Sequence, residues 1–227
     1  ITFDGQEWET IRIATIPFTM KKNPWDKTIY IGGDNNFGYI APDENDNYTY
    51  TSLSGDSAET GLITRIVFED SLAWFCSDQK LIRFNLNTKI KELVLSAKPG
   101  LPFTGIFMRG DNTFINVFSE GLYRLESDTL FPIVTGYLTA DVEILFCLPY
   151  NKSRVLTGRS DGTLALFVGV KYYDYTVRDD NYISDNVLSE GIALEDTAYA
   201  FSTLDGGAVV VGKTSGKLLQ IINNQIE

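Results

Sequence analysis

The chain has 227 residues, of which 44% are hydrophobic and 13% aromatic, so it is long enough to bury a substantial core in one or two domains. Lysine and arginine total 19 against 30 acidic residues, a formal net charge of −11, which makes nucleic acid and anionic membranes poor partners. The sequence contains no histidine, which removes the commonest general base, the commonest transition-metal ligand and any phosphoacceptor histidine.

An apolar run, a short polar turn and a second apolar run recur five times along the chain. The copies are IYIGGDNNFGYI (29–40), AWFCSDQKLIRF (73–84), FINVFSEGLYRL (114–125), RVLTGRSDGTLALF (154–167) and YAFSTLDGGAVVV (199–211). The residues that follow the turns are Gly38, Lys80, Gly121, Gly162 and Gly207, at spacings of 42, 41, 41 and 45. Glycine at four of these positions suits a turn that needs a positive φ.

Each copy is preceded by one more apolar run and followed by another, which gives four strands in every repeat. No helical periodicity is sustained, and no proline- or serine-rich linker divides the chain. Four short antiparallel strands at this period are typical of one blade of a β-propeller, whereas a β-sandwich would not explain so regular a period. The sequence therefore predicts an all-β fold, a propeller segment of four-stranded antiparallel blades forming a single domain.

The repeat also predicts where the blades lie. They are expected at about 14–54, 62–96, 103–136, 141–178 and 187–225. Residues 1–13 are interpreted as the third and fourth strands of a half blade, whose first two strands would lie upstream because the C-terminus does not supply them. We therefore expect about five blades plus a half blade, in a segment excised from a longer chain.

Several segments resemble the two-component regulator propellers. They are ITFDGQEW, TIYIGGDNNFGYI and NYTYTSL in the first part of the chain, and SEGLYRL, TGRSDGTLALF and FSTLDGGAVVV further along. The first block is most similar to the branch in which a GG-x-N-x-FGY signature precedes Y-x-Y-TSL. The chain departs from the family pattern at Tyr30-Ile31-Gly32 in place of Trp-Ile-Gly, at Asn23-Pro24-Trp25-Asp26 in place of an Asp-x-x-Gly turn, and at Lys80 in place of glycine.

The resemblance implies the periplasmic sensor region of a hybrid two-component or Tyr-rich-domain transcriptional regulator of Bacteroidetes. Such a region would bind an oligosaccharide or another small ligand and signal through the geometry of a homodimer. It would have no enzyme activity, cofactor or metal of its own and would touch neither nucleic acid nor the membrane directly. Relatives add a Tyr-rich sandwich, a membrane helix and kinase or DNA-binding parts, so a full-length chain could carry a histidine kinase.

In a propeller, the turns between second and third strands gather on one face, so their polar side chains are candidates for binding sugar hydroxyls. These candidates are Asn35, Asn36, Lys80, Glu120, Arg159, Asp161 and Asp205. Arg159 and Asp161 are favoured, because Asp and Asn are common in turns for conformational reasons but arginine is not. Trp25 lies in a connection beside Asn23 and Pro24, where its ring is a candidate platform for a pyranose.

Two other classes of function stay open from the residues alone. A propeller hydrolase or lyase acting on glycans would need two carboxyl groups about 5–9.5 Å apart, and a scaffold propeller would bind only protein.

DENDNY (43–48) and RDDNYISDN (178–186) are interpreted as solvated acidic connections rather than calcium loops. Cys76 and Cys147, expected on the second strand of blade two and the first strand of blade four, are interpreted as buried free thiols.

Overall fold

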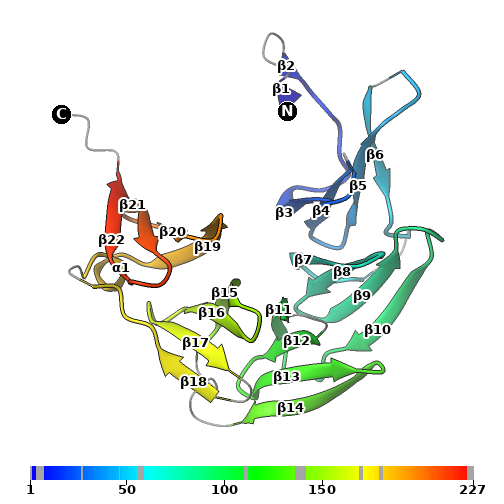
Figure 1. The fold of residues 1–227 in the computed structure, drawn as a ribbon. Helices are drawn as coiled ribbons and strands as arrows, with labels where there is room; N and C mark the ends of the chain where they lie inside the picture. The colour runs from blue at the N-terminus through cyan, green and yellow to red at the C-terminus, as the bar shows by residue number, and fades with distance from the viewer. Residues whose placement is uncertain are drawn as a thin grey trace. The chain divides into compact units, whose positions relative to one another are not determined.

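The computed structural model describes residues 2–3, 8–26, 28–45, 47–55, 59–109, 112–135, 142–168, 171–178 and 181–223. Within these ranges the strands form five four-stranded antiparallel sheets and one two-stranded pair (Figure 1). In each four-stranded sheet, strands that follow one another in the sequence are neighbours, so every sheet is a simple meander. These sheets are the blades of a β-propeller, which confirms the predicted fold class.

The strands of each blade follow in chain order. Blade 1 holds β3 (Pro17–Lys22), β4 (Ile29–Gly33), β5 (Phe37–Pro42) and β6 (Tyr48–Ser52). Blade 2 holds β7 (Ile63–Glu69), β8 (Leu72–Ser77), β9 (Lys80–Asn85) and β10 (Lys91–Ser96). Blade 3 holds β11 (Phe103–Arg109), β12 (Asn112–Val117), β13 (Gly121–Glu126) and β14 (Thr129–Thr135). Blade 4 holds β15 (Ile144–Asn151), β16 (Arg154–Arg159), β17 (Leu164–Val168) and β18 (Lys171–Asp174). Blade 5 holds β19 (Leu188–Leu194), β20 (Ala198–Thr203), β21 (Gly207–Gly212) and β22 (Leu218–Ile222).

The chain divides into two compact units, Ile1–Ile106 and Phe107–Glu227. The first unit contains blades 1 and 2, and the second contains blades 4 and 5, while the unit boundary falls within β11. Two short strands at the start of the chain, β1 (Thr2–Phe3) and β2 (Trp8–Glu9), pair with each other in antiparallel fashion. That this pair is half of a blade, and that the chain forms a single domain, both stay predictions.

The core of the first unit lies between blades 1 and 2. The second strands β4 and β8 are buried along almost their whole length, which explains why both are continuous apolar runs rather than alternating ones. The rings of Phe37 and Phe75 lie with centroids 4.5 Å apart, and Tyr30 packs 6.0 Å from Phe75. Ile66 on β7 is 3% exposed in the same cluster. Apolar side chains of neighbouring blades therefore bury one another.

The second unit contains two comparable clusters. One joins Phe107 and Phe114 of blade 3 to Phe167 of blade 4, with the Phe114 and Phe167 rings edge to face at 5.6 Å. The other joins Phe146 of blade 4 to Phe201 of blade 5, whose rings stack at 5.6 Å. Blade-to-blade packing through the inner strands thus repeats in both units.

The turn between the second and third strands differs from blade to blade. Gly121, Gly162 and Gly207 have φ values of 94°, 79° and 92°, as the sequence predicts. Gly38 does not: a Cβ there would lie 2.2 Å from the Thr51 carbonyl oxygen, so glycine is needed for close packing against β6. The positive φ of that turn, 50°, is at Asn35 instead.

Blade 2 closes its turn without glycine because a serine hydroxyl takes over the backbone hydrogen bonds. Ser77 Oγ accepts hydrogen bonds from the backbone nitrogens of Gln79 at 3.1 Å and Lys80 at 2.7 Å. In blade 3, Ser119 carries a positive φ of 62° two residues before Gly121. Lysine at position 80 is therefore compatible with the repeat, since the Ser77 side chain stabilises the turn of blade 2 without a glycine.

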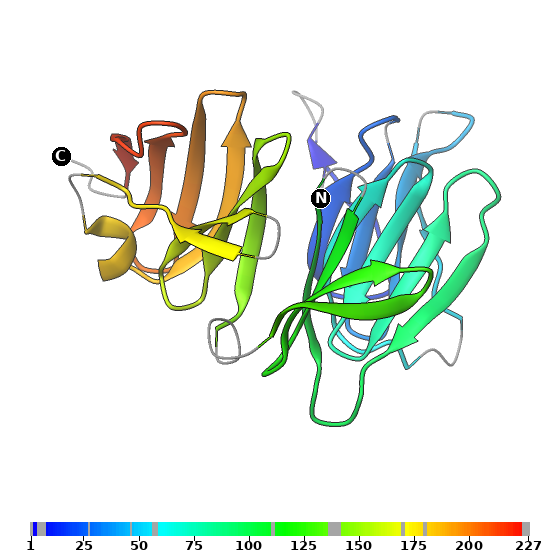
Figure 2. The ribbon, with the colours of Figure 1, turned by 60° about the horizontal axis from the view of Figure 1, so that its bottom comes forward.

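One helical turn interrupts the all-β pattern. The helix α1 (Tyr182–Asp185) lies in the connection between β18 and β19 and is the only helix in the described ranges (Figure 2). Among the described residues of 178–186, Arg178, Asn181, Ser184 and Asp185 are exposed, as predicted for a solvated connection. Ile183 is the exception, because it is only 6% exposed and packs against the core of blades 4 and 5. Cys76 on β8 is buried, Cys147 on β15 is half-buried and both are free thiols, as predicted for their strands and their redox state.

Candidate functional site

Seven of the eight predicted ligand-binding residues lie at turns between second and third strands. In the first unit, Asn35 and Asn36 belong to blade 1 and Lys80 to blade 2. In the second unit, Glu120 belongs to blade 3, Arg159 and Asp161 to blade 4, and Asp205 to blade 5. Because every blade is an antiparallel meander, these turns occupy the same end of their own blade. Whether they form one binding face across the two units stays a prediction.

Asn35 and Asn36 are engaged by the protein itself. Asn35 Oδ1 accepts a hydrogen bond from the Gly61 backbone nitrogen at 3.0 Å, and its own backbone nitrogen donates to the Gly61 carbonyl at 3.0 Å. Asn36 Oδ1 accepts a hydrogen bond from the Tyr50 hydroxyl at 2.7 Å. These side chains fix the turn of blade 1 to its outer strand and to the start of blade 2.

Lys80 and Glu120 also have partners within the chain. The Lys80 ammonium donates to the Glu59 carbonyl oxygen. Glu120 accepts a hydrogen bond from the Tyr123 hydroxyl at 2.6 Å. Burial, together with this hydrogen bond to a carboxylate, raises the pKa of Tyr123 to about 12. Both residues therefore have structural roles that their polar character alone did not indicate.

The two favoured candidates, Arg159 and Asp161, form an ion pair at the end of β16. The Arg159 guanidinium lies 3.4 Å from the Asp161 carboxylate, and the two side chains are 18% and 38% exposed. Asp161 Oδ1 also accepts hydrogen bonds from the Thr163 backbone nitrogen at 3.0 Å and the Thr163 hydroxyl at 2.5 Å, as an aspartate does in a turn. Arg159 therefore packs across a turn that Asp161 stabilises. The remaining candidate, Asp205, is exposed in the turn between β20 and β21 of blade 5.

Trp25 lies at the other end of blade 1 from the polar turns. It precedes the start of β4, whereas Asn35 follows the end of the same strand. Its side chain is 57% exposed, and its ring meets the ring of Phe68 edge to face, with centroids 6.1 Å apart and planes at 85°. A tryptophan that is so exposed, and oriented by a second ring, is available for contact with a ligand.

A hollow of about 300 Å³, here called the Trp25 hollow, opens beside this side chain. Its walls come from three turns, one between β3 and β4, one between β7 and β8 and one between β9 and β10. They are lined by Asn23, Trp25, Asp26, Asp70, Ser71, Leu86 and Asn87. Among the described residues, no hydrogen bond or ion pair engages the side chains of Asp70, Ser71 or Asn87, so these groups can bind a ligand.

The turns around the Trp25 hollow are held by their own hydrogen bonds. Asn23 Oδ1 accepts from the Trp25 backbone nitrogen at 3.2 Å, and Asp26 Oδ1 accepts from the Thr28 backbone nitrogen at 2.7 Å. On the opposite wall, Asn85 Oδ1 accepts from the backbone nitrogens of Asn87 and Thr88, both at 2.9 Å. The lining is therefore preorganised rather than formed by mobile loops.

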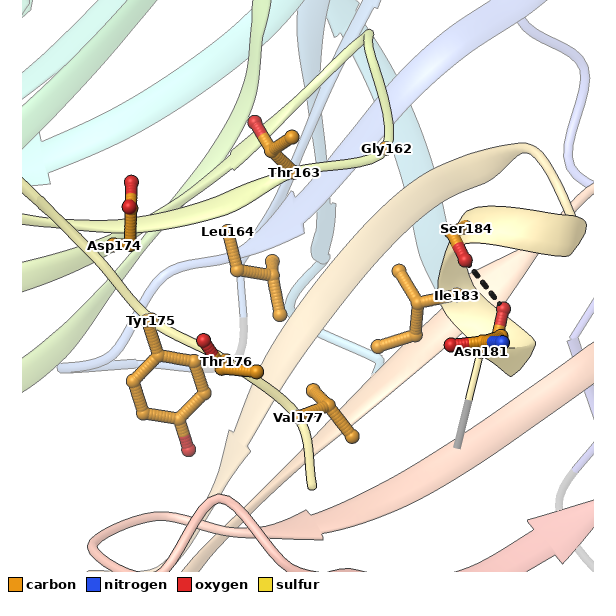
Figure 3. Close-up of a pocket in the computed structure, with 10 residues that line it drawn as sticks. All are labelled: Gly162, Thr163, Leu164, Asp174, Tyr175, Thr176, Val177, Asn181, Ile183 and Ser184. Atoms are coloured by element: carbon orange, nitrogen blue, oxygen red, sulfur yellow. Dashed lines mark hydrogen bonds between the residues drawn. The ribbon is translucent and has the colours of Figure 1, made fainter. Parts of the chain in front are cut away.

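A second hollow, of about 400 Å³, lies in the second unit beneath α1 and is here called the α1 hollow (Figure 3). It begins directly after the Arg159–Asp161 turn and is lined by Gly162, Thr163, Leu164, Asp174, Tyr175, Thr176, Val177, Asn181, Ile183 and Ser184. Only Gly162 among these residues stands out in the sequence, as a turn glycine, because the others lie in apolar runs and connections that give no local signal of a hollow.

Two further observations bear on the type of site. Within the ranges that the structure describes, no group of three or more Cys, Asp or Glu side chains is arranged to hold a metal ion. The helix that the structure describes is too short and too polar to cross a membrane.

No protein-family model and no curated protein matches the chain. Solved structures do match. The WD40 β-propeller domain of Doa1 aligns with a TM-score of 0.61 and 14% identity over 85% of this chain and 64% of that one. The computationally designed Ika8 protein aligns with a TM-score of 0.60 and 13% identity over 91% and 61%. Selenomethionine-substituted virginiamycin B lyase from Staphylococcus aureus aligns with a TM-score of 0.68 and 11% identity over 89% and 68%.

At these identities the similarity concerns the fold alone. The chain spans less than two thirds of the length of the Doa1 and Ika8 structures. Both the geometry of its blades and the propellers that it resembles lead to one conclusion: the chain has the β-propeller fold, with five four-stranded blades among its described residues.

Proposed function

We propose that the chain is a ligand-sensing propeller from the periplasmic region of a two-component-type transcriptional regulator, and that its ligand is an oligosaccharide. The observation that carries the binding proposal is the Trp25 hollow. A pyranose presents an apolar face that packs on an aromatic ring and edge hydroxyls that bind carboxylates and amides. The exposed Trp25 ring, the carboxylate of Asp70 and the amide of Asn87 line one hollow and supply both kinds of contact.

The sensing part of the proposal is supported by the regulator-like segments, above all GGDNNFGYI followed by YTYTSL. In such a sensor the propeller binds its ligand and changes the geometry of a homodimer, without bond-making or bond-breaking. The absence of histidine from the chain fits a binding role, because it removes the usual general base.

We also propose that the five blades belong to a larger propeller that includes residues 1–13 as part of a further blade. Met20 on β3 lies opposite Ile31 and is 55% exposed, whereas Ile66 at the equivalent position of blade 2, opposite Phe75, is 3% exposed. Ile66 is buried because side chains of blade 1, the preceding blade, cover it. By analogy, the exposure of Met20 supports a further blade before blade 1 that would cover Met20. The greater length of the propellers to which the chain is similar supports the same proposal.

The binding proposal is tested with a panel of neutral and acidic oligosaccharides, scored by thermal shift, tryptophan fluorescence and release of reducing ends. We expect at least one glycan to raise the melting temperature and change the fluorescence without being cleaved. Trp25→Ala should abolish the effect and Trp25→Phe should retain part of it. Leu93→Ala is the control, because Leu93 is also 57% exposed but lies on the outer strand β10.

Two results would overturn this proposal. Cleavage of a glycan would make the chain an enzyme, and a panel without any shift would leave the scaffold class as the better account. The sensing part is tested by sequencing the coding region on both sides: a downstream membrane helix with a kinase or DNA-binding region is expected, and its absence contradicts the proposal.

A further inference from the structure

The α1 hollow is built by the connection between blades 4 and 5, which runs from 175 to 187. The Tyr175 hydroxyl donates to the Gly212 carbonyl oxygen at 3.1 Å, and the Arg178 backbone nitrogen donates to the Gly216 carbonyl oxygen at 2.7 Å. Both acceptors belong to blade 5. The connection is therefore fixed to that blade, and the hollow exists before a ligand arrives.

The floor of the α1 hollow is aliphatic. Leu164 and Ile183 are each 6% exposed and belong to the core cluster of blades 4 and 5, and Val177 packs against the same cluster. Their three side chains converge on the middle of the hollow in Figure 3. A ligand that covers this floor must present an alkyl group of a few carbon atoms.

The one carboxylate of the lining points away from this floor. Asp174 pairs with Ala165, so it lies on the opposite face of the blade from Leu164, the residue before Ala165. Figure 3 accordingly draws the Asp174 side chain directed away from Val177 and Ile183. Neither lysine nor arginine is among the described residues that line the hollow. The floor therefore favours an uncharged ligand.

Asn181 supplies a polar group at the edge of the floor, next to Ile183 in Figure 3. It directly precedes α1, where an asparagine side chain commonly caps a helix, yet its side chain makes no capping hydrogen bond. No other hydrogen bond within the described ranges engages this amide. The hydroxyl groups nearby are already used, since Ser184 donates to the Asn181 carbonyl oxygen and Thr163 donates to Asp161. The Asn181 amide can therefore both donate to and accept from a ligand.

We propose that the α1 hollow binds a small secondary amide, with an alkyl group on Leu164, Val177 and Ile183 and the amide group hydrogen-bonded to Asn181. A secondary amide is uncharged and carries an N–H donor and a carbonyl acceptor beside an alkyl group, so it matches each property of the lining. N-acylated amino groups belong to this class. The site lies in the second unit, does not depend on the Trp25 hollow and requires no covalent step.

The test uses the whole 227-residue chain with labelled isoleucine, leucine and valine methyl groups, observed by nuclear magnetic resonance. The probes N-propylacetamide, propyl acetate and 2-hexanone have the same shape and differ only in the N–H, oxygen or methylene beside the carbonyl. The Ile183 methyl signal, assigned from its loss in Ile183→Val, should shift saturably with N-propylacetamide. We expect the ester and the ketone to bind about fivefold more weakly, as for loss of one hydrogen bond. A purely apolar hollow would instead favour the ketone, which is less polar than the amide.

Asn181→Ala is the informative variant, because it removes the amide and keeps the carbonyl oxygen that accepts from Ser184 and from the Asp185 backbone nitrogen. In this variant N-propylacetamide should bind no more tightly than propyl acetate. Asp174→Asn is the matched control and should leave all three affinities unchanged, since its side chain points away from the floor.

Three results would overturn the proposal: no shift of the Ile183 signal, no preference for the amide in the unaltered chain, or a preference that survives Asn181→Ala. None of them bears on glycan binding, which is read from Trp25. Loss of glycan binding would likewise leave the amide titration unaffected.

Discussion

Asn35 and Gly61 are joined by two hydrogen bonds that run in opposite directions, each 3.0 Å long. The backbone nitrogen of Asn35 donates to the Gly61 carbonyl, and the backbone nitrogen of Gly61 donates to Asn35 Oδ1. This pair connects the turn of blade 1 to the chain as it enters blade 2, over a separation of 26 residues. A side chain that the sequence suggests for ligand binding is thus part of the contact between blades.

Replacement of Asn35 should lower stability rather than ligand affinity. Asn35→Ala removes the bond to Gly61 and places alanine at a φ of 50°, so we expect the free energy of unfolding to fall by about 2–3 kcal/mol. Asn35→Gly removes only the side-chain bond and should cost about 1 kcal/mol less than alanine does. Denaturant unfolding measures both, and equal stability of Asn35→Ala and the unaltered chain would contradict the structural role.

Gly38 should not tolerate a side chain. The Cβ of Gly38→Ala would lie 2.2 Å from the Thr51 carbonyl oxygen and 2.7 Å from the Tyr50 hydroxyl, so β6 must move away from β5. Overpacking of this kind costs about 1–3 kcal/mol. Gly55→Ala is the matched control, because a Cβ at Gly55 meets nothing within 4 Å and should change stability by less than about 0.5 kcal/mol. Similar melting temperatures for the two variants would refute this packing.

Cys76 should be unreactive in the folded chain. It lies buried on β8, and burial raises the pKa of its thiol to about 12, so almost none is thiolate near neutral pH. In a Cys147→Ser background, which leaves Cys76 as the single thiol, labelling by an aromatic disulfide should proceed only as fast as the blade opens. The rate should therefore rise steeply with denaturant. Rapid labelling without denaturant would show that the β8 position is accessible.

The chain should lose stability at alkaline pH as buried tyrosines ionise. Burial raises the pKa of Tyr123 and of Tyr175 to about 12, above the value of 10.0 expected for an exposed phenol. Because the folded state holds these protons more tightly, their contribution is complete below pH 10 and is lost as the pH rises towards 12. Tyrosinate absorbance and circular dichroism should therefore change together.

Tyr123→Phe tests this pH dependence at one residue. It removes an ionising group of raised pKa, so the decline of stability between pH 10 and pH 12 should be shallower than in the unaltered chain. Tyr173→Phe serves as the control, since Tyr173 is 55% exposed on β18. An unchanged alkaline transition in Tyr123→Phe would exclude a contribution from this tyrosine.

The fold could be predicted because each hairpin is encoded locally. The runs that become β4 and β8 are apolar throughout since both of their faces are buried, and they recur at a period that only a propeller explains. The helix α1 could not be predicted, because four residues are too few to show helical periodicity. Its position depends on Ile183 packing between two blades, a contact made only in the folded chain.

The candidate sites were only partly predictable. Trp25 stood out because its sequence context is a connection, and the structure places it beside a hollow. Asp70 and Asn87 line the same hollow but lie 45 and 62 residues after Trp25. Nothing in the sequence around either residue indicates a binding site. Polar turns such as the one at Asn35 looked like binding groups, because a sequence does not reveal which backbone groups need them as partners.

The different turns of the five hairpins have a consequence for how the chain folds. Repeat proteins are prone to misassembly, in which a strand of one repeat pairs with the hairpin of another. Here a left-handed asparagine closes the hairpin of blade 1, a serine hydroxyl that of blade 2 and an aspartate that of blade 4. Each closure acts over only a few residues and sets the register of its own two strands. The local closures thus disfavour pairing between strands of different blades, while burial of each blade's apolar faces still waits for its neighbour.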